Sequence, residues 1–261
     1  MQDIIILESV FQEKIWGGTK LKEVYGYAIP SERTGECWAI SAHPHGNCKV
    51  LNGPLKGKKL SEVYEEHREL FNDCPSPKFP LLTKIIDAKD NLSVQVHPDD
   101  EYAKIHANEF GKTECWYILD CDDDAELVYG HHAKSKEEMI SMIENQEWDQ
   151  FLRRVKIKPG DFFYVPAGTV HALCKGTLVL EVQQSSDTTY RLYDYDRIDQ
   201  HGNKRDLHIM ESLDVITVPF EEQLLVPEEN HFLNGKKTVY ASNKFFTVEK
   251  WEIIGEYSEA H

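Results

Sequence analysis

A twelve-residue stretch, 160–171, constrains the fold of this chain more than any other feature. It reads Gly-Asp-Phe-Phe-Tyr-Val-Pro-Ala-Gly-Thr-Val-His. Gly160 follows a proline, so the stretch opens in a turn, and Pro166 and Gly168 close a second turn after an alternating, strand-like run. His171 then begins the next strand. The pattern predicts a hairpin of a small β-barrel, in which two turns fix the direction of the His171 ring, as a metal site requires.

A single histidine in a strand is more often a packed side chain than a ligand. The full spacing from Gly160 to His171, Gly-x5-Pro-x-Gly-x2-His, nevertheless resembles the second conserved motif of the cupin superfamily. The resemblance implies a mainly β protein built on a cupin-type, jelly-roll-like β-barrel with a few peripheral helices. It also implies further metal ligands upstream, on neighbouring strands.

Residues 92–99, Leu-Ser-Val-Gln-Val-His-Pro-Asp, supply two such candidates. They alternate strictly, so Leu92, Val94 and Val96 are expected on one face of a strand and Ser93, Gln95 and His97 on the other. In a half-exposed strand the polar face would be solvated, but the inward face of a barrel can be polar where it carries a site. Gln95 and His97, about 7 Å apart along the strand, are therefore candidate ligands, with Ser93 as a nearby hydroxyl. Most cupins have histidine in place of this glutamine.

Glu114 is a further candidate because it leads into an apolar strand, within Gly-Lys-Thr-Glu-Cys-Trp-Tyr-Ile-Leu at 111–119. The ordinary alternative is an edge-strand charge that prevents pairing with other chains. Together with Gln95, His97 and His171, however, the carboxylate completes a mixed oxygen and imidazole set that suits zinc or another divalent ion. Lys112 has the same strand parity as Glu114 and is expected in the same cavity.

A fourth region, 178–197, places Glu181, Asp187 and Arg191 within or beside strand-like, aromatic-rich sequence. The four regions together, in this order, resemble type I phosphomannose isomerase. The motifs that carry the resemblance are Ile15-Trp16-Gly17-Gly18, Gly35-Glu36-Cys37-Trp38, Gln95-Val96-His97-Pro98, Lys112-Thr113-Glu114, Pro166-Ala167-Gly168-Thr169-Val170-His171, and Gln184-Ser185-Ser186-Asp187 followed by Tyr190-Arg191.

The resemblance implies that one Zn²⁺ per chain is held by Gln95, His97, Glu114 and His171, and that Arg191 is the active-site arginine. It implies an aldose–ketose isomerase that interconverts mannose 6-phosphate and fructose 6-phosphate through an enediolate. A proton must then move between C1 and C2, and the candidates for carrying it are Glu181, Asp187 and Lys112. Substrate contacts are expected from Trp16, Ser93 and Lys112, and Tyr190, Tyr193 and Tyr195 could wall a sugar pocket.

Two other functions are compatible with this fold. An iron-dependent cupin oxygenase would use the same pocket, but such sites offer mainly histidines, so Gln95 and Glu114 disfavour it. A non-catalytic sugar-phosphate-binding cupin would keep the fold without the activity. The adjacent pair His131 and His132 is not expected to bind the metal, because neighbouring strand residues point to opposite faces, and a loop location is favoured.

Composition excludes several partners. A formal net charge of −16 disfavours nucleic acid and anionic membranes, and no apolar run approaches the ~20 residues that cross a bilayer. The six cysteines are scattered without a disulfide or zinc-finger spacing, which favours a reducing cytoplasm. In so acidic a chain a sugar phosphate must be attracted by local cations, such as Lys112 and Arg191.

The chain is expected to have two parts. Residues 1–220 are predicted to form the catalytic, metal-binding cupin domain, with helical insertions at 59–71, 99–108 and 135–148. Residues 219–235 are rich in Glu, Pro and Asn and are typical of a connection, whereas 237–254 alternate like strands. We therefore predict that 221–261 comprise a connection and an incomplete second cupin-like domain, inside which the sequence stops.

Overall fold

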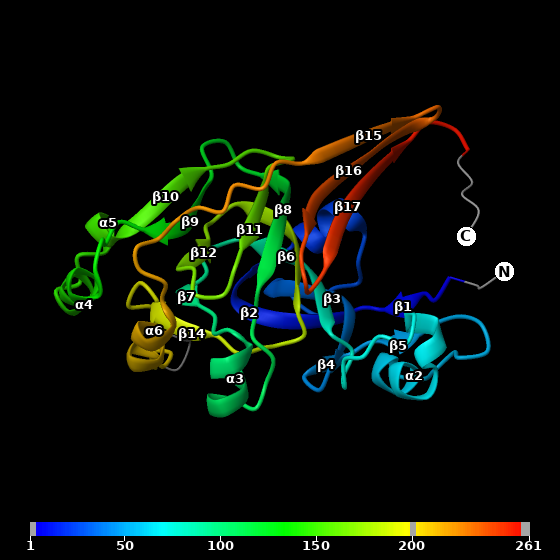
Figure 1. Ribbon diagram of the computed structural model, residues 1–261, viewed down its shortest axis with the longest axis horizontal. Helices are drawn as coiled ribbons and strands as arrows, with labels where there is room; N and C mark the ends of the chain where they lie inside the picture. The colour runs from blue at the N-terminus through cyan, green and yellow to red at the C-terminus, as the bar shows by residue number, and fades with distance from the viewer. Residues whose placement is uncertain (1–3, 199–201, 257–261) are drawn as a thin grey trace. The chain divides into compact units, whose positions relative to one another are not determined.

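The computed structural model describes residues 4–198 and 202–256 (Figure 1). The chain divides into two compact units, Met1–Glu221 and Glu222–His261. Within the described ranges, no helix is long and apolar enough to span a membrane.

Two antiparallel sheets form the first unit, which confirms the mainly β prediction (Figure 1). The larger sheet has the strand order β11 (Phe162–Val165), β8 (Glu114–Cys121), β13 (Thr177–Gln184), β6 (Leu81–Ala88), β3 (Thr34–His43) and β2 (Val10–Gly18), with β4 (Gly46–Asn47) paired to β3. The smaller has the order β10 (Leu152–Lys156), β9 (Glu126–His131), β12 (His171–Leu173), β7 (Val94–Val96) and β14 (Tyr190–Tyr193). β1 (Leu7–Glu8) pairs separately with β5 (Lys49–Val50).

Buried side chains from both sheets form the inner core, among them Trp16, Trp116, Leu127, Tyr129 and Val179. A second core lies on the opposite face of the smaller sheet, where Val94, Val96 and Val128 pack against helical residues. The smaller sheet is thus buried on both faces. Val94, Val96 and Val128 face outward, so the residues that alternate with them face inward, where polar groups can lie.

Helices α4 (Lys136–Glu144), α5 (Trp148–Phe151) and α6 (Ile209–Val215) contribute to this outer core (Figure 1). The Ser135 hydroxyl accepts a hydrogen bond from the backbone N–H of Glu138, so the predicted N-terminus of α4 is confirmed. The other helices are α1 (Lys20–Tyr25), α2 (Leu60–Glu66) and α3 (Asp100–His106). The helix predicted for 59–71 is interrupted at His67 and continues as a short 3₁₀-helix, Arg68–Phe71.

The second unit is a three-stranded antiparallel sheet of β15 (Glu228–Phe232), β16 (Gly235–Ser242) and β17 (Thr247–Ile253). The strand-like alternation of 237–254 therefore appears as β16 and β17. β15 lies in the stretch that we expected to be a connection. Its polar sequence has no strand pattern, so the strand was not predicted, and pairing with β16 gives it a strand conformation. That this unit begins a second cupin-like domain stays a prediction.

Candidate metal centre and inner cavity

Cross-strand pairing in the smaller sheet brings three of the predicted side chains into one row. Gln95 of β7 is the direct partner of His171 in β12 on one side and of Arg191 in β14 on the other. Directly opposed residues of an antiparallel pair share one face of the sheet. The pleat that sends Val94 and Val96 to the outer core therefore turns Gln95 inward.

A second row crosses the larger sheet. Trp38, Lys84, Glu181 and Trp116 are successive partners across β3, β6, β13 and β8. Glu114, the first residue of β8, pairs with Gln183 of β13, two residues along from the pair of Trp116 and Glu181. The larger sheet thus contributes carboxylates and a lysine, and the smaller sheet contributes imidazoles and an amide.

His97, Glu114 and His171 form a compact cluster that is almost fully buried. One ligand-type atom from each lies within 4.8 Å of the others. The Nε2 atom of His97 is 3.6 Å from Glu114 Oε2, and the Nε2 atom of His171 is 3.3 Å from Glu114 Oε1. These separations suit three ligands arranged around one cation.

Unpaired atoms test whether a cation fits this cluster. Among the described residues, both Glu114 oxygens and the Nε2 atom of His97 are buried and form no hydrogen bond. Buried polar atoms without partners cost free energy, and a divalent cation would satisfy all three. The Nε2 atom of the Gln95 amide is 3.2 Å from the Nε2 atom of His171. Rotating the amide by 180° exchanges its nitrogen and oxygen, which brings the Gln95 oxygen next to the cluster. The cluster of His97, Glu114 and His171 therefore fits a metal ion, and the Gln95 amide lies beside it.

Local contacts prepare these groups for a metal. The Nδ1–H group of His171 donates to the carbonyl of Thr169 at 2.8 Å, which leaves the Nε2 lone pair facing Glu114. Burial lowers the pKa of His171 to about 4 and lowers the pKa of His97 as well, so both rings are neutral at pH 7. Burial, together with the nearby Glu181 carboxylate, raises the pKa of Glu114 to about 8. Both histidines can thus ligate directly, whereas Glu114 must lose a proton.

A cavity of about 300 Å³ lies beside the cluster, and Gln95 is part of its wall. Trp16 and Ser93, predicted as substrate contacts, also line it. Its charged lining residues are Lys14, Lys84, Lys112, Arg191 and Arg205, with Glu36, Glu181 and Asp187. Cations therefore outnumber carboxylates in the wall of this inner cavity, although the chain as a whole is acidic.

Lys84 is the charged residue that sequence reasoning missed at the centre of the site. Its Nζ atom is 3.1 Å from Glu181 Oε2, and both side chains are buried. Burial opposes the charge on Lys84, but Glu181 and the other nearby carboxylates together outweigh burial, so the pKa of the lysine is raised. Burial opposes ionisation of Glu181 too, and Lys84 lowers its pKa. The sequence did contain a signal for Lys84, since this lysine lies inside the largely apolar strand Leu81–Ala88. A charged side chain is rarely buried in such a strand unless it has a partner of opposite charge.

The other predicted catalytic residues border the same cavity. Lys112 Nζ is 3.6 Å from Glu114 Oε2, as their shared strand parity predicted. Asp187 is held by His45, whose Nδ1 atom is 2.9 Å from Asp187 Oδ2. Burial would raise the pKa of Asp187, but the hydrogen bond to His45 and nearby lysines lower it. Arg205, Lys14 and Glu36 also reach the cavity and were not anticipated.

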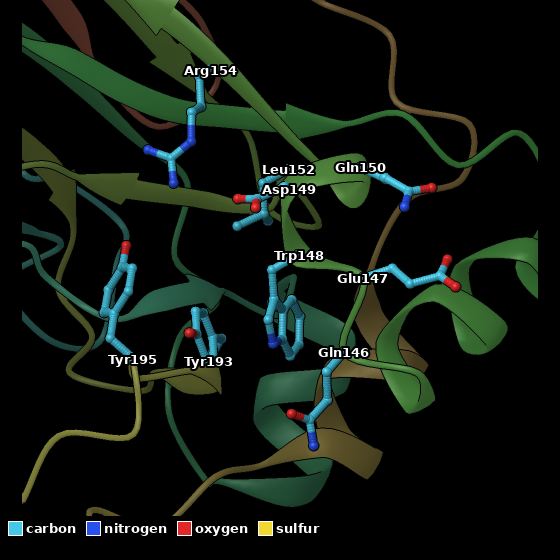
Figure 2. Close-up of a pocket in the computed structure, with 9 residues that line it drawn as sticks. All are labelled: Gln146, Glu147, Trp148, Asp149, Gln150, Leu152, Arg154, Tyr193 and Tyr195. Carbon is cyan, nitrogen blue, oxygen red and sulfur yellow. The ribbon is translucent and has the colours of Figure 1, made fainter.

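Several expectations require correction. Tyr190, Tyr193 and Tyr195 do not line the inner cavity. Tyr190 belongs to the outer core because it alternates with the inward Arg191, and Tyr193 and Tyr195, which follow a register irregularity after Arg191, pack against that core (Figure 2). Leu92 lines the inner cavity next to Ser93, since β7 begins only at Val94.

His131 also differs from its predicted loop location, because it ends strand β9. Its Nε2–H group donates to the carbonyl of Thr217 at 2.9 Å, and its ring stacks on Phe151. These contacts give the side chain a structural role, and it lies outside the His97–Glu114–His171 cluster, as expected.

The fold and the cluster define a metal-binding β-barrel protein of the cupin type. Residues 4–129 match the family model for phosphomannose isomerase type I, catalytic domain. The chain is 58% identical over 252 residues to the probable mannose-6-phosphate isomerase GmuF of Bacillus subtilis, covering 96% of this chain and 80% of the relative. It is 54% identical over 255 residues to the mannose-6-phosphate isomerase of Streptococcus mutans, covering 98% and 80%.

Solved structures agree. The crystal structure of the mannose 6-phosphate isomerase from Bacillus subtilis matches with a TM-score of 0.95 and 53% identity, covering 97% of this chain and 81% of that one. A zinc-bound mannose 6-phosphate isomerase, 17% identical, shares the fold with a TM-score of 0.68, covering 90% and 80%. The chain belongs to the type I phosphomannose isomerase family, in its short bacterial form.

Proposed function

We propose that this chain is a zinc-dependent mannose-6-phosphate isomerase that interconverts mannose 6-phosphate and fructose 6-phosphate. The observation that carries the proposal is the buried cluster of His97, Glu114 and His171 beside a cation-rich cavity. Close relatives are named for this activity. The ligand set with Gln95 mixes oxygen and imidazole donors, which suits zinc better than the histidine-rich sites of iron oxygenases.

The residues around the cavity divide the chemistry between binding and proton transfer. A bound zinc ion would supply Lewis-acid stabilisation of negative charge on the sugar oxygens. Arg191 lines the cavity beside Gln95 and remains charged at every working pH, so it can hold an enediolate oxygen by directed hydrogen bonds. Ser93 and Lys112 are proposed to contact the substrate, with Trp16 as an apolar wall.

Contacts narrow the choice of proton carrier. Glu181 uses both carboxylate oxygens within the protein, since Oε1 accepts from the Trp116 indole N–H at 3.0 Å and Oε2 faces Lys84. This favours a role for Glu181 in holding the charge of Lys84. Lys112 and Asp187 are then the better candidates for moving the proton between C1 and C2.

The remaining partners follow from charge and cysteine chemistry. The five cationic side chains of the cavity wall match a sugar phosphate. The overall charge of −16 disfavours nucleic acid and anionic membranes as partners. All six cysteines are free, which supports a reducing compartment such as the cytoplasm.

Comparing the turnover of mannose 6-phosphate with that of free mannose tests this proposal. The phosphorylated product can be followed by its conversion to glucose 6-phosphate, and the unphosphorylated product must be measured directly. We expect activity only with the phosphorylated sugar, loss of activity on chelation and recovery with added zinc. Similar efficiencies for both sugars would reject the phosphate requirement. Calorimetric binding of mannose 6-phosphate without turnover would favour the non-catalytic sugar-phosphate-binding cupin. Recovery of activity with ferrous iron but not with zinc would favour an iron-dependent protein.

A further inference from the structure

A histidine in the turn between β3 and β4 contacts one carboxylate of the inner cavity. His45 lies between His43, the last residue of β3, and Gly46, the first residue of β4. Its Nδ1 atom is 2.9 Å from the Oδ2 atom of Asp187, which lines the inner cavity. The His45 side chain is 68% exposed and is not among the described residues that line this cavity. His45 therefore reaches the Asp187 carboxylate without belonging to the wall that faces a bound sugar.

The neighbouring His43 anchors the backbone of this turn. The N–H group of His45 donates to the Nδ1 atom of His43 at 3.2 Å. His43 must then carry its own proton on Nε2, which lies 3.5 Å from Glu109 Oε1. Burial lowers the pKa of His43, although the Glu109 and Asp187 carboxylates oppose it, so the ring is neutral at pH 7 and keeps this tautomer. The Gln12 amide also donates to the carbonyl of His45, at 3.1 Å. The turn thus presents the His45 ring from a fixed backbone.

Asp187 has one oxygen that is held and one that is not. Within the described residues, His45 bonds its Oδ2 atom and no hydrogen bond reaches its Oδ1 atom. The Glu181 carboxylate, by contrast, uses both oxygens inside the protein. The Lys112 ammonium lies beside the Glu114 carboxylate. Asp187 is therefore the candidate proton carrier that offers a basic atom to the cavity.

The surroundings of Asp187 keep its carboxyl group ionised. Burial would raise its pKa, but the hydrogen bond to His45 and the charges of three lysines lower it. The lysines are Lys84, Lys112 and Lys14. Among the described residues only His45 forms a hydrogen bond or ion pair with the carboxylate, whereas the lysines act by charge at longer range. A directed N–H donor also fixes the rotation of a carboxylate, so this one contact affects both the orientation and the acidity of Asp187.

We propose that His45 is a positioning residue, whose Nδ1–H group holds one Asp187 oxygen so that the other oxygen transfers the proton between C1 and C2 of the sugar. This inference rests on the proposed isomerase function. Asp187 Oδ1 takes the C2 proton of the aldose, the C2–H electron pair forms the C1=C2 bond, and the carbonyl electrons move onto O1. The C1=C2 electrons then take the proton back at C1, while the O2–H electron pair forms the C2=O2 bond and the O2 proton moves to O1. The product is the ketose, and the carboxylate is restored.

Steady-state kinetics of the zinc-loaded chain with mannose 6-phosphate tests this role. His45→Ala should lower kcat about tenfold or more and leave KM within about twofold, because a misplaced base slows the reaction without weakening binding. The acid limb of the kcat/KM profile should move to higher pH, because loss of the N–H donor raises the pKa of Asp187 and activity needs the carboxylate. The phosphate of the substrate titrates alike in every variant, so a difference between profiles reports the protein.

His45→Asn is the conservative variant that separates this role from a structural one. The Nδ2–H group of an asparagine can take the place of the imidazole Nδ1–H group, so this variant should recover most of kcat and the original acid limb. His67→Ala is the matched control, because it removes another histidine–carboxylate pair, in which His67 Nδ1 is 3.1 Å from Glu69 Oε1, outside the inner cavity. Its kinetics should be those of the original chain. Tm and metal content should stay near the original values in every variant, since exposed pairs add little stability.

A double-variant cycle completes the experiment. Asp187→Asn should lose most of the activity, and adding His45→Ala should cause no further loss, because the two residues act through one contact. Normal kinetics with an unshifted acid limb in His45→Ala would overturn the inference. Equal losses in His45→Ala and His45→Asn, a further loss in the Asp187→Asn background, or a fall in Tm or metal content in His45→Ala would also overturn it. In these cases the original chain still turns over, whereas absence of turnover by the original chain would overturn the proposed function, and this inference with it.

Discussion

At the scale of single residues, the Glu114 carboxyl group lies at the centre of the cluster without a hydrogen-bond partner among the described residues. Both oxygens are buried without a hydrogen bond in the described structure, between two neutral histidines. Leaving such a group unpaired costs on the order of 1–3 kcal/mol per atom. The raised pKa of Glu114 expresses the same cost, since the metal-free protein keeps a proton on this side chain.

Metal content should therefore depend on the cluster in an all-or-none manner. We expect about one divalent ion per chain by elemental analysis, with zinc preferred, and loss of the metal in His171→Ala. His131→Ala is the matched control, because its ring contacts Thr217 and Phe151 and not the cluster. Full metal retention by His171→Ala would contradict the assignment of the ligands.

Zinc affinity should also depend on pH through Glu114. Its pKa of about 8 means that the carboxyl group is protonated below that pH in the metal-free protein and must release a proton on binding. Affinity is then expected to fall about tenfold per pH unit as the pH drops below 8, down to the range where the histidines protonate. Competition with a chelator between pH 6 and pH 9 measures this, and a flat profile would mean that Glu114 is ionised without the metal.

Arg191 is expected to act on the reaction and not on stability. Its NH1 group donates to the backbone carbonyl of Asp206 at 2.7 Å, whereas the carboxylate of Asp194 is bound by Arg197 and Arg205. Arg191→Ala should lower kcat by roughly 100-fold or more, comparable with the loss of one oxyanion donor, with metal content and Tm near those of the original chain.

Arg191→Lys should recover part of this loss, because a lysine keeps the charge without the planar pair of donors. Steady-state kinetics of both variants, with metal analysis beside them, measures the effect. Near-normal turnover by Arg191→Ala would make the residue structural and leave Lys112 and Asp187 as the catalytic candidates.

At the scale of elements, the turn at Gly168 joins the metal site to the helical side of the barrel. Its N–H group donates to the carbonyl of His97, and its own carbonyl accepts from the N–H of Thr217. Gly168 has a φ of 86°, and a Cβ atom there would lie 2.4 Å from the Thr217 hydroxyl and 3.0 Å from the carbonyl oxygen of Val215. No other residue fits this turn without displacing a neighbour.

Gly168→Ala should accordingly destabilise the protein by about 1–3 kcal/mol and weaken metal binding, because His97 shares the turn's hydrogen bonds. Thermal unfolding and metal titration measure the two effects. Gly160→Ala is the matched control, since its φ is 93° but a Cβ atom there would meet only the Tyr117 hydroxyl, at 3.9 Å. Equal losses in both variants would show that backbone strain, and not the contact with Thr217, sets the cost.

At the scale of the whole molecule, the chain should be cut between its two units first. Residues 221–227 are exposed and have no regular structure, and they begin with Glu221 and Glu222. A protease specific for glutamate should cleave there before it enters the first unit. Because every predicted metal ligand lies in that unit, the large fragment should keep its metal after gel filtration. Rapid cleavage within the first unit, or metal loss on cutting at this segment, would contradict the assignment of residues 1–220 as a self-sufficient metal-binding domain.

The sequence by itself determined the mainly β fold and brought out the candidate metal ligands. Turn residues at Gly160 and Gly168 need left-handed backbone, and both glycines adopt it. Alternation in 93–97 placed Gln95 and His97 together, because the period of a strand is local. Family resemblance then set the expected activity. These features depend on neighbours within a few residues, so they are legible in the chain itself.

Only the tertiary structure decided which charges face one another. Lys84 and Glu181 are almost a hundred residues apart and meet because β6 and β13 are adjacent in a register that no local pattern specifies. Tyr193 and Tyr195 follow an irregularity in the pairing after Arg191 and pack against the outer core, whereas sequence reasoning placed them around the substrate. Pairing register and bulges arise from contacts between distant strands, which is the physical reason that the sequence alone did not reveal them.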